Sequence, residues 1–206
     1  KIKKLQTDKD GNLIILYAQN KDEQYTFIES AKEKGYEVLL LDSPIIPHLM
    51  QKLESKKEKI KFSRVDSDTL ENLIKKDEEV ISKLTDEEKE KLKPMIETAV
   101  ENEKYTVQLE ALDSNSMPFM LAQPEFMRRM KEMQQTGGGA MGNLPEMYSL
   151  IVNTNHELVG KILNTRTEKK RNSLIKQSID LAKLSQNNLT GKDLTEFINR
   201  SIDLIK

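Results

Sequence analysis

The sequence predicts a two-part protein: a small α/β module with a parallel sheet, then an α+β domain with a three-stranded sheet and C-terminal helices. Three observations support this fold class. Apolar runs alternate with helical segments up to residue 65, three strand-like segments follow residue 104, and the chain ends in amphipathic helices. Alternating strands and helices indicate parallel pairing, whereas separate groups of strands and helices indicate α+β. We expect the α/β module to comprise residues 1–76 and the second domain to comprise residues 77–206.

The first module is predicted from two apolar runs and one alternating segment. Residues 13–18 are continuously apolar, as in a strand covered on both faces, and 38–41 form a second run. The helical segment between them ends at Gly35, which suits a left-handed helix end. A short helix opened by Pro47 leads to the alternating segment 60–65, and this order implies a parallel sheet.

Parallel sheets of this kind often bind nucleotides, but this sequence lacks the phosphate-binding features. Residues 19–22 are Gln-Asn-Lys-Asp and cannot form a glycine-rich phosphate cradle. The glycine-rich segment 137–142 has neither a preceding strand nor a Lys-Ser/Thr ending, and it reads as a flexible loop. A structural module is therefore favoured, with a small-molecule-binding α/β protein as the alternative.

Residues 66–104 are strongly charged, and we interpret them as a solvated connector. Within this stretch, 85–88 read Thr-Asp-Glu-Glu and predict a capping box that begins a helix. Pro94 is expected to bend or divide that helix, because proline lacks the backbone N–H and clashes with the preceding turn.

The second part contains three predicted strands at 105–112, 118–122 and 148–152. Residues 153–155, Asn-Thr-Asn, are expected to cap a short helix. Two longer amphipathic helices end the chain, and their apolar faces need a surface on which to pack. Pattern alone leaves two solutions open: a bundle with a second copy, or packing on the chain's own sheet.

Composition excludes several kinds of site and predicts a cytoplasmic protein. Cysteine is absent, which excludes disulfides and thiolate metal sites. Basic and acidic residues nearly cancel, so no nucleic-acid partner is expected, and no apolar run approaches membrane-spanning length. The two histidines, His48 and His156, have no metal-ligand spacing, and neither is expected to be catalytic.

Methionine is unevenly distributed, since seven of nine lie between Met117 and Met147. A predicted helix begins at 124–125 and carries Phe126, Met130 and Met133 at helical spacing. Methionine side chains are flexible and polarisable, which suits a surface that accepts differently shaped apolar partners. An ordinary core-facing stripe explains the pattern equally well.

Several segments resemble the heat-shock protein 90 chaperones. Residues 33–45, EKGYEVLLLDSPI, resemble the KKGYEVLLLTDPID signature near the end of that family's middle domain. Residues 124–134 match its methionine-containing segment, and 148–156, YSLIVNTNH, resemble its EINPxH junction. Residues 197–200 fall in its last dimer helix. The likeness runs in family order along the chain and is nearest the bacterial form, because no acidic EEVD tail follows the last residue.

The resemblance implies a non-enzymatic region of an ATP-driven chaperone. Residues 1–76 would be the tail of the middle domain, and 77–206 a C-terminal domain whose last two helices form a dimeric four-helix bundle. The implied interface residues are Leu174, Ile175, Ile179, Ala182, Leu194, Phe197, Ile198, Ser201, Ile202 and Ile205. The implied client-contact residues are Phe126, Met127, Met130 and Met133.

The resemblance also predicts partners and cofactors. The partners are a second copy of the chain and unfolded or partly folded client proteins, with no nucleic acid and no membrane. ATP and Mg²⁺ would bind a family domain upstream of the first residue, so this piece is expected to have no cofactor, catalytic or metal site of its own. Its own role would be homodimerisation and client contact.

Overall fold

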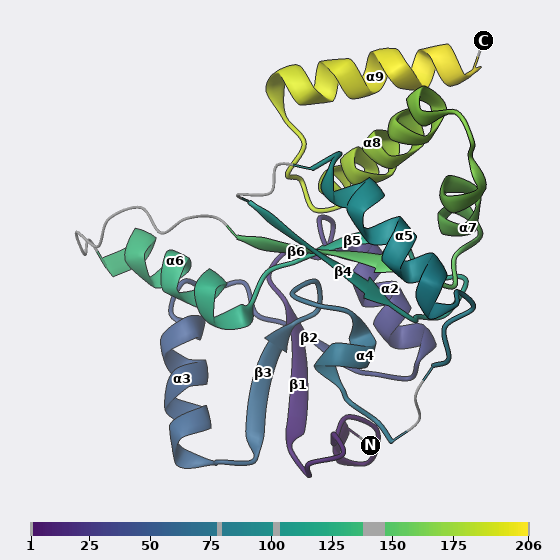
Figure 1. Ribbon diagram of the computed structural model, residues 1–206. Helices are drawn as coiled ribbons and strands as arrows, with labels where there is room; N and C mark the ends of the chain where they lie inside the picture. The colour runs from purple at the N-terminus through teal and green to yellow at the C-terminus, as the bar shows by residue number, and fades with distance from the viewer. Residues whose placement is uncertain (1, 78–79, 101–103, 138–146, 206) are drawn as a thin grey trace. The chain divides into compact units, whose positions relative to one another are not determined.

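A computed structural model describes residues 2–77, 80–100, 104–137 and 147–205 (Figure 1). The chain divides into two compact units, one made of 1–79 and 122–145 and the other of 80–121 and 146–206. The first unit is therefore assembled from two separate stretches of chain. The domain boundary expected after residue 76 stays a prediction, since compactness does not establish independent folding.

The first unit contains a three-stranded sheet and five helices within the described residues. Its elements are α1 (Ile2–Leu5), β1 (Leu13–Ala18), α2 (Tyr25–Glu33), β2 (Val38–Leu40), α3 (Ile46–Lys56), β3 (Ile60–Arg64), α4 (Leu70–Leu73) and α6 (Glu125–Gly137). In Figure 1, α3 runs alongside β3, and α6 lies at the end of α3.

The sheet of the first unit has the order β2-β1-β3, and both pairs are parallel. The predicted parallel sheet is thus confirmed. Leu16 and Tyr17 of the central strand β1 are fully buried, as the continuous apolar run predicts. Strand β2 lies at the edge, where Leu39 and Leu40 are exposed although the run looks equally apolar. The helix before β2 ends as expected, with Gly35 in the left-handed region at φ +76°.

The second unit contains another three-stranded sheet, with the order β4-β6-β5. Its elements are α5 (Asp86–Glu97), β4 (Tyr105–Glu110), β5 (Phe119–Ala122), β6 (Tyr148–Asn153), α7 (Glu157–Asn164), α8 (Glu168–Leu184) and α9 (Gly191–Ile205). Strands β4 and β6 pair in parallel, with Val107 opposite Leu150. The mixed fold with two small sheets, consistent with an α+β assignment, is confirmed.

Helix α5 belongs to the core of the second unit, so the interpretation of 66–104 as a solvated connector is wrong. Leu92 and Ile96 are fully buried among strand and helix residues such as Val107, Leu150 and Ile162. Two apolar residues four apart on a charged helix are enough to bury one stripe. Their burial explains why a segment with so few apolar residues is still ordered.

The predicted capping box at the start of α5 is confirmed. The Thr85 hydroxyl accepts from the Glu88 N–H at 3.3 Å, and the Glu88 carboxylate accepts from the Thr85 N–H at 2.8 Å. Pro94 lies inside α5 but does not divide it, since the helix continues to Glu97. The Pro94 carbonyl still accepts the Thr98 N–H at 3.1 Å, so the following turn remains closed.

The cap of α7 is His156, and the expectation that 153–155 would cap this helix is wrong. The His156 Nδ1 accepts from the Leu158 N–H at 3.0 Å, which requires an unprotonated Nδ1. The asparagines instead join neighbouring segments. Asn153 accepts from the Leu112 N–H at 3.3 Å, and the buried Asn155 amide donates to the Leu112 carbonyl at 3.0 Å.

Candidate functional site

The methionine segment forms helix α6, which packs on the sheet and α3 of the first unit. Its first residue, Glu125, accepts a hydrogen bond from the Tyr17 hydroxyl of β1 at 2.7 Å. Glu125 also accepts from the Arg64 backbone N–H of β3 at 3.3 Å. A carboxylate in the first turn of a helix is further favoured by the helix dipole. The start of α6 is therefore tied to two strands.

A buried arginine completes this junction. The Arg128 side chain is almost fully buried and donates to both Glu125, at 2.6 Å, and the Tyr17 hydroxyl. Its guanidinium also lies 5.6 Å from the centre of the Tyr17 ring. Burial alone would raise the pKa of Glu125, but the Arg128 charge and the hydrogen bonds from Arg128 and Tyr17 together hold it below its ordinary value. We call Tyr17, Glu125 and Arg128 the latch.

Arg129 makes a second connection, on the side of α6 that faces α3. It pairs with Glu54 of α3 at 2.7 Å and with Glu125 at 2.8 Å. It also donates to the Phe62 carbonyl of β3 at 2.6 Å. Glu54 in turn accepts the Phe62 N–H at 2.7 Å, so one carboxylate joins α3, β3 and α6.

Beside this network lies a groove of about 740 Å³ between α3, β3 and α6. Its apolar lining residues are Pro47, Ile60, Phe62, Phe126, Met130 and Met133. Phe126 is 69% exposed, whereas Met130 and Met133 are half-buried. Met127 is half-buried and does not line the groove. Three of the four predicted client-contact residues therefore lie together on an accessible apolar surface.

Helices α8 and α9 of the second unit pack against each other (Figure 1). Arg200 of α9 forms an ion pair with Asp180 of α8, whose carboxylate is buried. Gln177 donates to the Ser201 hydroxyl at 2.8 Å, so a second polar pair fixes the same two helices. The contact uses specific polar groups as well as apolar area, which sets the register of α9 on α8.

The ten predicted interface residues fall into two groups by burial. Ile175, Ile179, Ala182 and Phe197 are buried within this chain, the first three of them in the core of the second unit, and Leu174, Leu194 and Ser201 are half-buried. On α9 the exposed members are Ile198 and Ile202, each 47% exposed, and Ile205, 86% exposed. These three follow i, i+4, i+7 and form one stripe.

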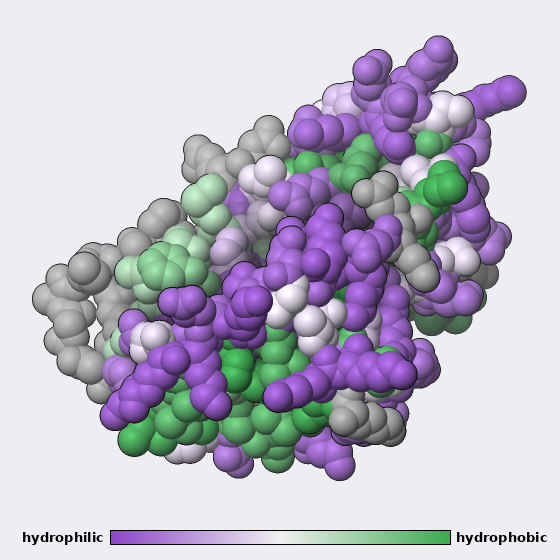
Figure 2. Space-filling model, turned by 90° about the horizontal axis from the view of Figure 1, so that it is seen from below, coloured by the Kyte–Doolittle hydropathy of each residue, from purple (hydrophilic) through white to green (hydrophobic). Residues whose placement is uncertain are grey.

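Helix α8 adds exposed apolar residues that the sequence analysis did not assign to an interface. Leu181 and Leu184 are 45% and 39% exposed. In the sequence, these two leucines lie just beside the stripe of α8 that is buried. That relation can be recognised only once Ile175, Ile179 and Ala182 are known to face the core. Figure 2 shows one face of the molecule, on which hydrophobic side chains gather in patches among hydrophilic ones.

Comparison with known proteins gives the family. The model of the Hsp90 protein family matches residues 8–203. The chain belongs to the Hsp90 family. This match spans both compact units and confirms the resemblance stated from the sequence.

The most informative relatives are bacterial Hsp90 proteins. The chain is 35% identical over 273 aligned residues to the chaperone protein HtpG of Bacteroides thetaiotaomicron, covering 99% of this chain and 40% of that protein. It is 40% identical over 185 residues to the HtpG of Porphyromonas gingivalis, and this alignment covers 87% of this chain and 27% of that protein. A more distant HtpG, from Wolinella succinogenes, is 28% identical. The chain thus spans about two-fifths of the length of the HtpG of Bacteroides thetaiotaomicron.

The histidines and acidic residues of this Hsp90 chain do not form a metal site among the described residues. Within the described residues, no group of three or more histidine, aspartate or glutamate side chains could hold a metal ion. His48 is exposed, and His156 is used as a helix cap. None of the described helices is long and apolar enough to span a bilayer. Apart from Gly137, the last residue of α6, the glycine-rich segment 137–142 lies outside the described residues.

Proposed function

We propose that this chain is the C-terminal region of an ATP-dependent, cytoplasmic chaperone, in which it provides homodimerisation and client contact. Residues 1–76 would end the middle domain, and 77–206 would form the dimerisation domain. ATP and Mg²⁺ would bind elsewhere in the complete protein, so this region would not itself be an enzyme. Family membership supports the chaperone role.

The observation that carries the dimerisation proposal is the exposed apolar stripe of Ile198, Ile202 and Ile205 on α9. Isolated exposed apolar residues are common on surfaces, but a continuous stripe on a terminal helix indicates an interface. The exposed Leu181 and Leu184 on the adjoining α8 extend the apolar area. Pairing α8 and α9 with their counterparts in a second copy would form a four-helix bundle and bury these residues.

Light scattering over a dilution series tests dimerisation. We expect twice the mass of one chain for the unmodified protein and a shift to monomer for Ile198→Asp. Burying an unpaired carboxylate at an interface costs ~2 kcal/mol or more, which weakens the dimer by about 30-fold or more. Asn199→Asp, one position along the same exposed helix, is the matched control and should remain dimeric. A monomer at every concentration would contradict the proposal.

The client-contact proposal rests on the groove beside α6. Phe126 is the most exposed aromatic side chain described, and the methionines next to it can adjust to varied apolar side chains. Because Met130 and Met133 are only half-buried, they retain accessible surface for a bound segment. The groove would therefore accept short apolar stretches of unfolded chains.

Fluorescence anisotropy with a labelled, permanently unfolded polypeptide tests client contact. We expect Phe126→Ser to weaken binding by ~10-fold, since an aromatic anchor in an apolar groove contributes at least ~1.4 kcal/mol. Tyr25→Ser removes another exposed aromatic from the same unit and should leave affinity unchanged. The double variant Met130→Ser with Met133→Ser distinguishes client contact from a purely structural role. A loss of ~2 kcal/mol in the free energy of unfolding with unchanged client affinity would show that these methionines only support the fold.

A further inference from the structure

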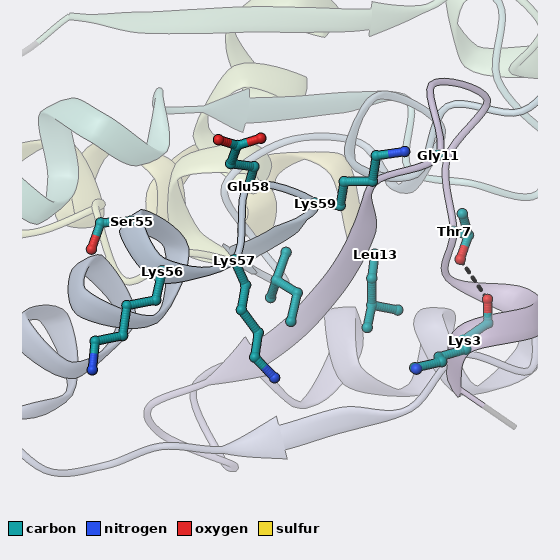
Figure 3. Close-up of a pocket in the computed structure, with 10 residues that line it drawn as sticks. Lys3, Thr7, Gly11, Leu13, Ser55, Lys56, Lys57, Glu58 and Lys59 are labelled. Atoms are coloured by element: carbon teal, nitrogen blue, oxygen red, sulfur yellow. Dashed lines mark hydrogen bonds between the residues drawn. The ribbon is translucent and has the colours of Figure 1, made fainter.

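A second concave site lies at the end of the first unit's sheet where β1 and β3 begin (Figure 3). Its volume is about 670 Å³, within the range of small-molecule sites. The residues that line it are Lys3, Thr7, Gly11, Leu13, Ser55, Lys56, Lys57, Glu58, Lys59 and Ile60. They come from α1, the turn before β1, the end of α3 and the start of β3.

Four lysines and one glutamate line this site, which gives it a net charge of +3, whereas the whole chain carries −1. None of the four ammonium groups is in an ion pair with a described residue. The positive charge is therefore not neutralised within the described part of the protein.

The helix dipole explains only part of this arrangement. Lys56 and Lys57 lie at the C-terminal end of α3, where cations are favoured. Lys3 lies in the last turn of the short helix α1, so its position also fits a helix end, whereas Lys59 precedes β3 and is not at a helix end. Like charges gathered in a concavity repel one another and raise the local potential, so a bound anion would relieve a cost to the folded state.

The side chains also provide an orientation for a ligand. In Figure 3, Lys57 and Lys3 point toward the same side and flank Leu13, while the Glu58 carboxylate points the opposite way. Leu13 and Ile60 are half-buried and line the site, so they add apolar surface to it. Lysine acts as a point charge suited to phosphate rather than as a planar partner for a carboxylate.

We propose that this lysine-lined site binds a small phosphate-bearing anion. Pairing of the phosphate oxygens with Lys3 and Lys57 would supply the affinity, and an organic part of the ligand would rest on Leu13 and Ile60. The site shares Glu58 and Ile60 with the groove beside α6, but Lys3 and Lys57 do not line that groove, so the proposed anion contacts differ from the proposed client contacts.

Isothermal titration calorimetry of the whole 206-residue chain with pyrophosphate tests the proposal. We expect saturable heat. Lys3→Gln combined with Lys57→Gln should weaken the affinity for pyrophosphate by ~10-fold, because the double variant removes two charge pairs. Lys21→Gln with Lys52→Gln removes the same charge from exposed positions outside the site and should change affinity less than ~2-fold.

Glycerol phosphate, as a second probe, distinguishes the sources of the phosphate. Heat from pyrophosphate alone would assign the site to free polyphosphate, and heat from both would assign it to phosphate esters as well. Two results would overturn the proposal: no saturable heat from either probe up to ~5 mM, or equal weakening in the pocket and control variants.

Discussion

Arg128 shows how one buried charge can tie the first turn of α6 to the sheet. A polar residue between apolar ones on a helix reads as solvent-facing, yet this guanidinium is almost fully buried. Burying a charge is tolerated only where it is paired and hydrogen-bonded, and Glu125 and the Tyr17 hydroxyl provide those partners. No pattern in the sequence identifies this partnership, because it joins residues more than 100 positions apart.

The latch makes the stability of the first unit depend on pH. The pKa of Glu125 is lowered in the folded protein, so its stabilisation is present above the ordinary value of 4.5 and is lost as the pH falls toward the lowered value. We expect Glu125→Gln to destabilise the protein by ~2 kcal/mol at pH 7, because Arg128 loses its charged partner. The difference in free energy of unfolding between Glu125→Gln and the unmodified protein should be smaller at pH ~3.5 than at pH 7.

Urea unfolding followed by circular dichroism at both pH values measures this effect. Glu23→Gln removes the same charge at an exposed position and serves as the control, with little change at either pH. A destabilisation by Glu125→Gln that stays constant with pH would argue against an ionised latch.

At the scale of single elements, α5 is held at its start by the Thr85–Glu88 capping box. We expect Thr85→Ala to lower the free energy of unfolding by ~1 kcal/mol, since the Glu88 N–H loses its acceptor. Chemical denaturation measures the loss, and Glu90→Ala, at an exposed position within the helix, should cost much less. Equal effects of the two substitutions would show that the cap contributes nothing.

Local patterns predicted most of the elements, because each depends on a few neighbouring residues. The apolar run at β1, the capping box of α5 and the glycine after α2 all appear as expected. The burial of α5 and the exposure of β2 could not be predicted in this way. Both depend on which segment lies alongside, and periodicity carries no information about that neighbour.

The candidate site was predictable to a similar degree. Helical spacing identified Phe126, Met130 and Met133, and the structure brings all three to one groove. The opposite wall, with Pro47 and Phe62, was not predicted, since it is remote in sequence. Which apolar residues of α8 face the core and which are exposed could not be predicted from the pattern of α8 alone.

For the whole molecule, dimerisation should couple assembly to stability. If only the folded chain associates, the melting temperature rises with protein concentration by mass action. We expect this dependence for the unmodified protein and its loss in Ile198→Asp, with Asn199→Asp behaving as the unmodified protein does. Differential scanning calorimetry at several concentrations measures it, and a constant melting temperature for the unmodified chain would contradict a dimer of folded chains.

The two-stretch construction of the first unit has a consequence for its synthesis. Arg64 in β3 and its partner Glu125 are 61 positions apart, so the sheet is complete well before α6 is made. At ~5–20 residues per second, a ribosome needs about 3–12 s to cover that distance. During this interval Pro47, Ile60 and Phe62 have no α6 beside them. We therefore expect a nascent chain of this protein to expose an apolar surface for seconds before α6 covers it.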